Sequence, residues 1–153
     1  MAVQSSVSGL DSHLGYWLRY VSNHVSQAFA RKVEARGVTV AEWVLMRHLL
    51  DEEPLAPSRL AEHMGMTRGA VSKLANRLVA KSLVVAAANP ADGRGQILSL
   101  TPAGRALVPE LAALADANDA EFFGDLDPDA YATLLDFLTQ FVERRGLKSE
   151  PVD

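Results

Sequence analysis

One short segment of the sequence, residues 67–81, concentrates side chains that can donate hydrogen bonds. Arginine and asparagine can each make paired hydrogen bonds to a base edge, while lysine and serine can hold phosphate oxygens. On a helical wheel the polar residues share one arc: Arg68, Gly69, Ser72, Lys73, Asn76 and Arg77. The apolar residues share the other: Val71, Leu74, Ala75 and Leu78. A solvated surface helix is the alternative interpretation, but such helices commonly mix charges, and this polar arc has no acid.

A second candidate cation lies in the segment Asn89-Pro90-Ala91-Asp92-Gly93-Arg94-Gly95-Gln96, between the apolar runs 83–85 and 97–100. Glycine, proline, asparagine and aspartate in this density predict the turn of a β-hairpin. A solvated turn needs no cation between two glycines. We therefore expect the hairpin tip to present Arg94 to a partner, with Gly93 and Gly95 allowing close backbone approach.

The charges divide unevenly along the chain, whose net charge is −4. Residues 58–105 carry seven cations and two anions, while the rest of the chain carries eight cations and seventeen anions. This asymmetry favours a polyanion-binding module on an acidic body, although scattered solvated charge is the alternative.

The elements that must position these residues are helices with recognisable starts. Thr39 and Glu42 have capping-box spacing, Pro57 suits a first helical turn, and Thr101-Pro102 and Asp127-Pro128 repeat the cap-then-proline pattern. We expect helices over residues 10–35, 40–50, 57–65, 67–81, 102–124 and 128–145, with the hairpin before the fifth helix and residues 148–153 frayed. A tight helix pair followed by a two-stranded hairpin is a winged helix-turn-helix arrangement.

The residues on these elements resemble the MarR family of bacterial transcriptional regulators. The resemblance lies in Ser58-Arg59-Leu60-Ala61-Glu62-His63-Met64-Gly65, Val71-Ser72-Lys73-Leu74, Arg77-Leu78, Asp92-x-Arg94 and Leu98-x-Leu100-Thr101-x-x-Gly104. It implies a mainly α fold with a small β-hairpin wing, formed by residues 1–153 as one chain. Residues 8–36 and 102–146 would be dimerisation helices, and residues 38–101 the winged helix-turn-helix DNA-binding lobe.

The resemblance also implies a function and a set of DNA contacts. A homodimer would bind a pseudo-palindromic operator in double-stranded DNA, as a sequence-specific transcriptional regulator and repressor. Arg68, Gly69, Ser72, Lys73, Asn76 and Arg77 would lie at the major groove. Arg94 would enter the minor groove, and Asp92 would orient Arg94 through a charge-assisted bond.

Two departures from the family pattern keep an alternative open. The strand entering the wing ends in Ala86-Ala87-Ala88, where relatives often carry basic residues, and Ser82 replaces the usual glycine after the recognition helix. Fewer phosphate contacts would weaken DNA binding. The alternative is a winged-helix protein-interaction module with weak or lost DNA binding.

A small-molecule effector is a further expectation from the resemblance, since many such regulators bind small aromatic acids. The expected pocket residues are Trp17, Tyr20, His24, Trp43 and Arg47, with tryptophan walls and a cation for a carboxylate. The alternative is that these side chains pack at a dimer interface.

Other classes of protein are disfavoured. The chain has no cysteine, which excludes thiol chemistry and cysteine-bound zinc. His13 and His24 are too far apart on one helix to share a metal ion, and motifs for nucleotide binding or hydrolysis are absent. With no long apolar run and no signal-peptide pattern, we expect a cytoplasmic protein without cofactor, metal or enzymatic activity.

Overall fold

The computed structural model describes residues 7–153, and these are mostly helical. The helices are α1 (Leu14–Glu34), α2 (Val40–Asp51), α3 (Pro57–Met64), α4 (Arg68–Ala80), α5 (Pro102–Phe123) and α6 (Pro128–Arg145), and the strands are β1 (Val84–Asn89) and β2 (Asp92–Leu100). The order confirms the predicted winged helix-turn-helix with long flanking helices.

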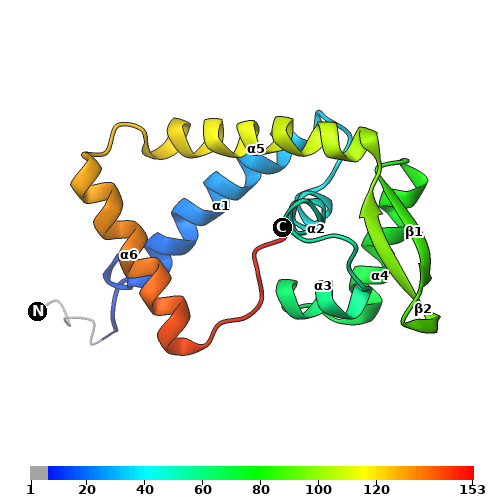
Figure 1. The fold of residues 1–153 in the computed structure, drawn as a ribbon. Coiled ribbons are helices and arrows are strands. Elements are labelled where there is room, and N and C mark those ends of the chain that lie inside the picture. Colours follow the sequence, from blue (N-terminus) through cyan, green and yellow to red (C-terminus); the bar gives the residue numbers. More distant parts are fainter. Residues whose placement is uncertain (1–6) are drawn as a thin grey trace, which may run out of the picture.

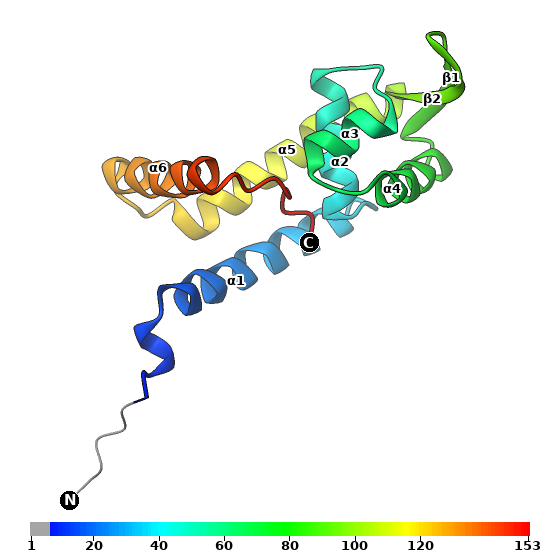
Figure 2. The ribbon, with the colours of Figure 1, turned by 90° about the horizontal axis from the view of Figure 1, so that it is seen from below.

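The elements form a lobe with a helical arm (Figures 1 and 2). α2, α3, α4 and the β1–β2 hairpin make the lobe, and α5 runs from the hairpin out along α1. α6 turns back beyond the outer end of α5. The predicted DNA-binding residues therefore sit on a lobe that α5 connects to the arm.

Local side-chain caps explain where the helices begin. Thr39 and Glu42 form the predicted capping box at the start of α2. The hydroxyls of Thr67 and Thr101 each accept a hydrogen bond from a backbone N–H in the first turn of α4 and α5. The first helix begins later than predicted: Leu10–Ser12 form a separate 3-10 turn, and α1 starts at Leu14.

The core lies inside the lobe and under the inner end of the arm. Leu45, Met46 and Leu49 of α2 are completely buried and pack against the apolar face of α4. On α4 the buried residues are Val71, Leu74, Ala75 and Leu78, as the helical wheel predicts. The polar face of α4 is thereby directed outward.

The hairpin differs from the predicted loop in where its strands meet. Asn89 pairs with Asp92, but Ala88 pairs with Gln96, so the register shifts and β2 carries extra residues between these pairs. Gly93, Arg94 and Gly95 form this bulge inside β2, rather than a loop at the tip. Bulges bend a strand and change where a side chain points. At its other end, β2 pairs with Leu55 through two backbone hydrogen bonds at Leu98.

The expectation that residues 148–153 fray is wrong. This segment leaves α6 and returns to the lobe, ending beside α2 (Figure 1). Its contacts join residues more than 80 positions apart, such as the hydrogen bond from the Glu150 N–H to the Met64 carbonyl at 3.1 Å. No local sequence signal encodes such contacts.

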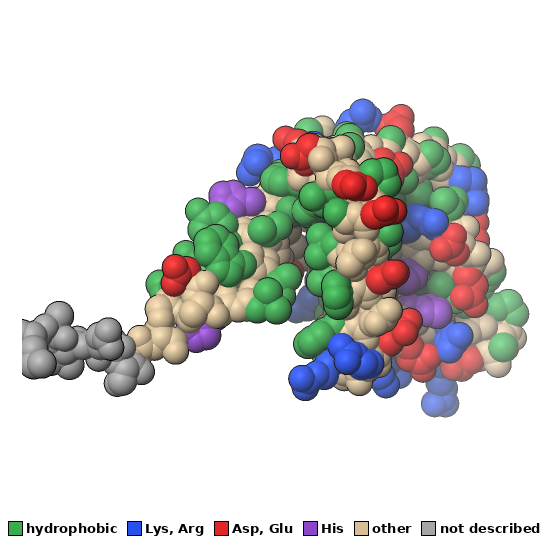
Figure 3. Space-filling model, turned by 90° about the vertical axis from the view of Figure 1, so that its left-hand side faces the viewer, with side chains coloured by type: hydrophobic (Ala, Val, Ile, Leu, Met, Phe, Trp, Pro, Cys, Tyr) green, Lys and Arg blue, Asp and Glu red, His purple; other side chains and the backbone are tan. Residues whose placement is uncertain are grey.

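The arm exposes a large amount of apolar surface. No residue of α6 is buried, and Phe137 is 68% exposed. Hydrophobic side chains gather along α1 and α6 on the face shown in Figure 3, including Leu14, Trp17 and Leu18 of α1. Such surface is more than a monomer of this size commonly exposes. Among residues 7–153, no helix is long and apolar enough to cross a membrane.

Candidate nucleic-acid interface

The structure sorts the seven cations of residues 58–105 into two groups. Three are paired within the chain: Arg59 with Glu62, Lys81 with Glu42, and Arg105 with Glu53. The other four have no ion-pair partner within residues 7–153: Arg68, Lys73, Arg77 and Arg94. All four are exposed. The unpaired cations of this region are therefore the ones that the sequence assigned to DNA.

The outward face of α4 is open to a large partner. Arg68, Gly69, Lys73, Asn76 and Arg77 are exposed, and Ser72 is half-buried. A Cβ added at Gly69 would meet nothing within 4 Å, so no packing within the chain requires glycine there. The open surface at Gly69 allows another molecule to approach the helix backbone closely.

The turn before α4 depends on Gly65. This residue ends α3 with φ 64° and ψ 35°, a left-handed conformation that glycine adopts without steric cost. The two-residue connection to Thr67 then sets α4 across α3, as a helix-turn-helix requires. The N-terminus of α4, with the positive end of its helix dipole, is left facing outward beside Arg68.

The wing presents Arg94 from the bulge of β2. Asp92 supports it, although differently from the expectation: the Asp92 Oδ1 accepts a hydrogen bond from the Arg94 backbone N–H at 3.1 Å. Within the described part of the chain, no ion pair joins the two side chains. Asp92 therefore holds the backbone of the bulge and leaves the Arg94 guanidinium unpaired.

A buried ion pair that sequence reasoning missed fixes the other end of α4. Glu42 of α2 is 0% exposed, and both of its carboxylate oxygens accept hydrogen bonds at 2.9 Å from Nζ of Lys81, which follows α4. Lys81 is thus a structural cation and not a free one. The capping-box spacing identified Glu42, but its second role depends on a residue 39 positions away.

Ser82 completes this end of the helix. Its φ is 59°, so a non-glycine residue does keep the left-handed conformation expected here. The Thr101 hydroxyl donates a hydrogen bond to the Ser82 carbonyl at 2.7 Å. The exit of α4 is therefore held from both α2 and the start of α5.

Glu53 anchors the base of the wing. Its carboxylate accepts a hydrogen bond from the Leu100 backbone N–H at 2.9 Å and pairs with Arg105 of α5. The wing is thereby attached to the lobe on both sides of β2, since Leu55 pairs with Leu98.

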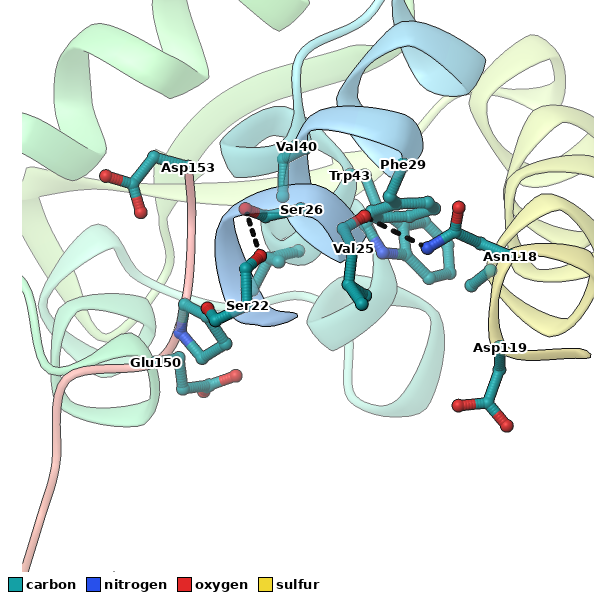
Figure 4. Close-up of a pocket in the computed structure, with 13 residues that line it drawn as sticks. Ser22, Val25, Ser26, Phe29, Val40, Trp43, Asn118, Asp119, Glu150 and Asp153 are labelled. Atoms are coloured by element: carbon teal, nitrogen blue, oxygen red, sulfur yellow. Dashed lines mark hydrogen bonds between the residues drawn. The ribbon is translucent and has the colours of Figure 1, made fainter. Parts of the chain in front are cut away.

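A cavity of about 410 Å³ lies between the lobe and the arm. Figure 4 shows Phe29 of α1 and Trp43 of α2 in its wall, and Asn118 and Asp119 of α5 on one side. Of the five expected effector residues, Trp43 alone is among the residues that line this cavity. Trp17, Tyr20 and His24 instead form an aromatic row on α1, where Tyr20 and His24 stack at 5.4 Å. Arg47 pairs with Asp51 along α2.

The outer ends of α5 and α6 are joined next to this cavity. The Tyr131 hydroxyl donates a hydrogen bond to Asp119 at 2.7 Å. This bond and the negative charge of Asp119 raise the pKa of Tyr131 above its ordinary value of 10.0.

Two histidines meet at the edge of the lobe. His48 and His63 stack at 5.5 Å, and each faces a carboxylate: Glu150 for His48 at 2.8 Å and Glu52 for His63 at 3.6 Å. Within residues 7–153 no group of three or more potential ligands is arranged to hold a metal ion.

Comparison with known proteins agrees with this architecture. The sequence model described as the MarR family matches residues 36–95. An HTH-type transcriptional repressor of Mycobacterium tuberculosis is 29% identical over 116 residues, covering 76% of this chain and 84% of the relative.

Solved structures show the same fold. MarR from E. coli in complex with operator DNA superposes with a TM-score of 0.76 at 24% identity, covering 84% of this chain and 93% of that one. BpsR of Bordetella bronchiseptica, whose DNA binding is regulated by 6-hydroxynicotinic acid, gives 0.79 at 24% identity, covering 89% and 97%.

Proposed function

Because this chain belongs to the MarR family of transcriptional regulators, which bind DNA and are not enzymes, we propose that it acts as a homodimeric repressor of a pseudo-palindromic operator. One observation carries the proposal: the unpaired cations of residues 58–105 lie on the outward face of α4 and on the wing. Each other cation of this region is neutralised by a carboxylate inside the chain.

The proposed contacts follow from this arrangement. α4 enters the major groove, where Arg68 and Asn76 can reach base edges, and Ser72, Lys73 and Arg77 hold phosphates or bases. Gly69 allows the helix to lie close to the DNA. Arg94 reaches the adjacent minor groove, whose negative potential is strongest where it is narrow.

The proposed dimer is formed by the arm. Residues 8–36 and 102–146 contain the exposed apolar faces of α1 and α6, and a second copy of this chain would cover them. Residues 38–101 form the DNA-binding lobe. Two lobes held by one arm can reach successive major grooves on one side of the duplex.

The repressor assignment is supported by the name of the mycobacterial relative. Release by a small effector is supported by the cavity between lobe and arm, because a ligand there can favour one lobe position over another.

The test is a mobility shift with DNA from upstream of the protein's own gene, measured over a series of salt concentrations. A specific complex that weakens as salt rises is expected, because phosphate contacts release counterions. A random duplex of equal length is the control. Equal affinity for both duplexes, or no complex at low salt, would favour the alternative of a protein-interaction module, which the uncharged Ala86-Ala87-Ala88 segment keeps open.

A further inference from the structure

The C-terminal segment of the described chain, residues 148–153, is here called the strap. It crosses from the end of α6 to the lobe and lies on the helix-turn-helix turn (Figures 1 and 2). The Glu150 N–H donates to the Met64 carbonyl at 3.1 Å, and the Ser149 hydroxyl donates to the Gly65 carbonyl at 3.3 Å. Val152 packs against the buried core. The strap thus binds α3 through main-chain and apolar contacts together.

The strap fits closely over Gly65. A Cβ at this position would come within 2.1 Å of the Lys148 carbonyl oxygen, a distance that no side chain can occupy. Gly65 therefore serves two purposes, the left-handed end of α3 and the close approach of the strap.

One side chain connects the strap to α2. The Glu150 carboxylate lies 2.8 Å from Nε2 of His48, which stacks on His63. Breaking this contact would leave the strap attached to the lobe by its α3 and core contacts alone.

The same strap forms a wall of the cavity between lobe and arm. Glu150, Pro151 and Asp153 line the cavity, and Figure 4 shows the carboxylates of Glu150, Asp153 and Asp119 around it. The opposite wall contains the aromatic rings of Phe29 and Trp43. No lysine, arginine or histidine is among the lining residues. This lining attracts a cation, because an aromatic face and a carboxylate both do so, and it repels a carboxylate.

We propose that the cavity binds a small aromatic cation, and that this ligand releases the strap by drawing the Glu150 carboxylate away from His48. The proposal rests on the DNA-binding function above and replaces the expected aromatic acid with a ligand of opposite charge. Its regulatory consequence is direct, because the strap joins α6 of the arm to α3 of the lobe. Release of the strap lets the lobes move relative to the arm and lowers the affinity for DNA.

The binding test uses 2-phenylethylamine and, as a matched anion, 3-phenylpropionate. The chain has two tryptophans, so the Trp17→Phe variant leaves Trp43 in the cavity wall as the sole reporter. The amine is expected to change Trp43 emission saturably at millimolar concentration, and the acid is expected to have no effect. Equal binding of both, preference for the acid, or binding of neither overturns the proposal.

The coupling test uses Glu150→Gln, with Glu34→Gln on α1 as the charge-matched control. Glu150→Gln is expected to weaken amine binding and DNA binding by about fivefold or more, the lower end of typical coupling between sites. Hydrogen exchange should rise at the Glu150 amide, which the Met64 carbonyl protects. The amine should then no longer affect DNA affinity.

The outcomes separate this proposal from the proposed function. A chain that binds its upstream DNA normally but shows unchanged amine response and amide exchange in Glu150→Gln retains the function and refutes the strap. A chain that binds no DNA refutes the function, while Trp43 emission and amide exchange still report on the cavity and strap.

Discussion

Arg94 is the only cation in residues 84–100, so the wing depends on one side chain. Arg94→Ala is expected to weaken operator binding at least tenfold, consistent with about 1–3 kcal/mol for a specific contact. Fold and dimer should be unchanged, because no contact within the described chain involves the guanidinium. Titration of labelled operator measures the affinity, and Arg31→Ala, which removes an exposed α1 cation, is the control. Equal affinities of the two variants would remove the wing from the mechanism.

Gly69 offers a test of close approach at the other DNA-facing element. Gly69→Ala should leave thermal stability equal or higher, because alanine favours helix by up to about 1 kcal/mol over glycine. DNA affinity should nevertheless fall by about fivefold, equivalent to about 1 kcal/mol. Gly15→Ala is a matched control, since Gly15 is also the second residue of a helix with open space at its Cβ. If both variants bind DNA like the parent, the helix does not approach the duplex at Gly69.

Side-chain types and helical periodicity were sufficient to predict which residues of α4 face outward. They did not show which cations are free. Lys81 and Arg105 have the same composition signal as Lys73 and Arg94, yet carboxylates from distant parts of the chain neutralise them. Similarly, the Asp92-x-Arg94 spacing identified a supporting aspartate but not that its bond goes to the backbone.

At the scale of elements, α4 is held against α2 by the Glu42–Lys81 pair, whose members differ in exposure. Lys81→Met should cost about 3–5 kcal/mol, because it leaves a fully buried carboxylate without a cation. Glu42→Gln should cost less, because Lys81 is 39% exposed and water can solvate its amine. Urea unfolding measures both. Arg47→Met, which breaks the exposed pair with Asp51, should cost at most about 1 kcal/mol. A smaller loss for Lys81→Met than for Glu42→Gln would contradict this account.

Element boundaries followed from the sequence where local chemistry sets them. Thr39, Thr67 and Thr101 cap the helices that they were expected to cap. The bulge of β2 and the docking of the strap were not predicted, because both depend on partners outside their own segment. The bulge needs the register of β1 against β2, and the strap needs α3.

At the scale of the molecule, the exposed faces of α1 and α6 predict the assembly. Leu138→Asp places a charge on the apolar face of α6, where Leu138 is 45% exposed. It should convert the dimer to a monomer and weaken operator binding, because the two lobes then bind independently. Light scattering coupled to size exclusion measures the mass. Val85→Asp, at an exposed apolar residue of β1, is the control and should remain dimeric. A dimeric Leu138→Asp would place the interface elsewhere.

The division of charge between lobe and arm gives the molecule an electric dipole that opposes its net charge. At about 0.01 M salt the screening length is about 30 Å, so DNA interacts with the whole molecule, whose net charge is repulsive. At physiological salt the screening length is about 8 Å, and DNA near the lobe senses mainly its basic face. The association rate measured by stopped flow should therefore rise and then fall as salt increases. A regulator of uniformly positive charge would bind more slowly at every increment of salt.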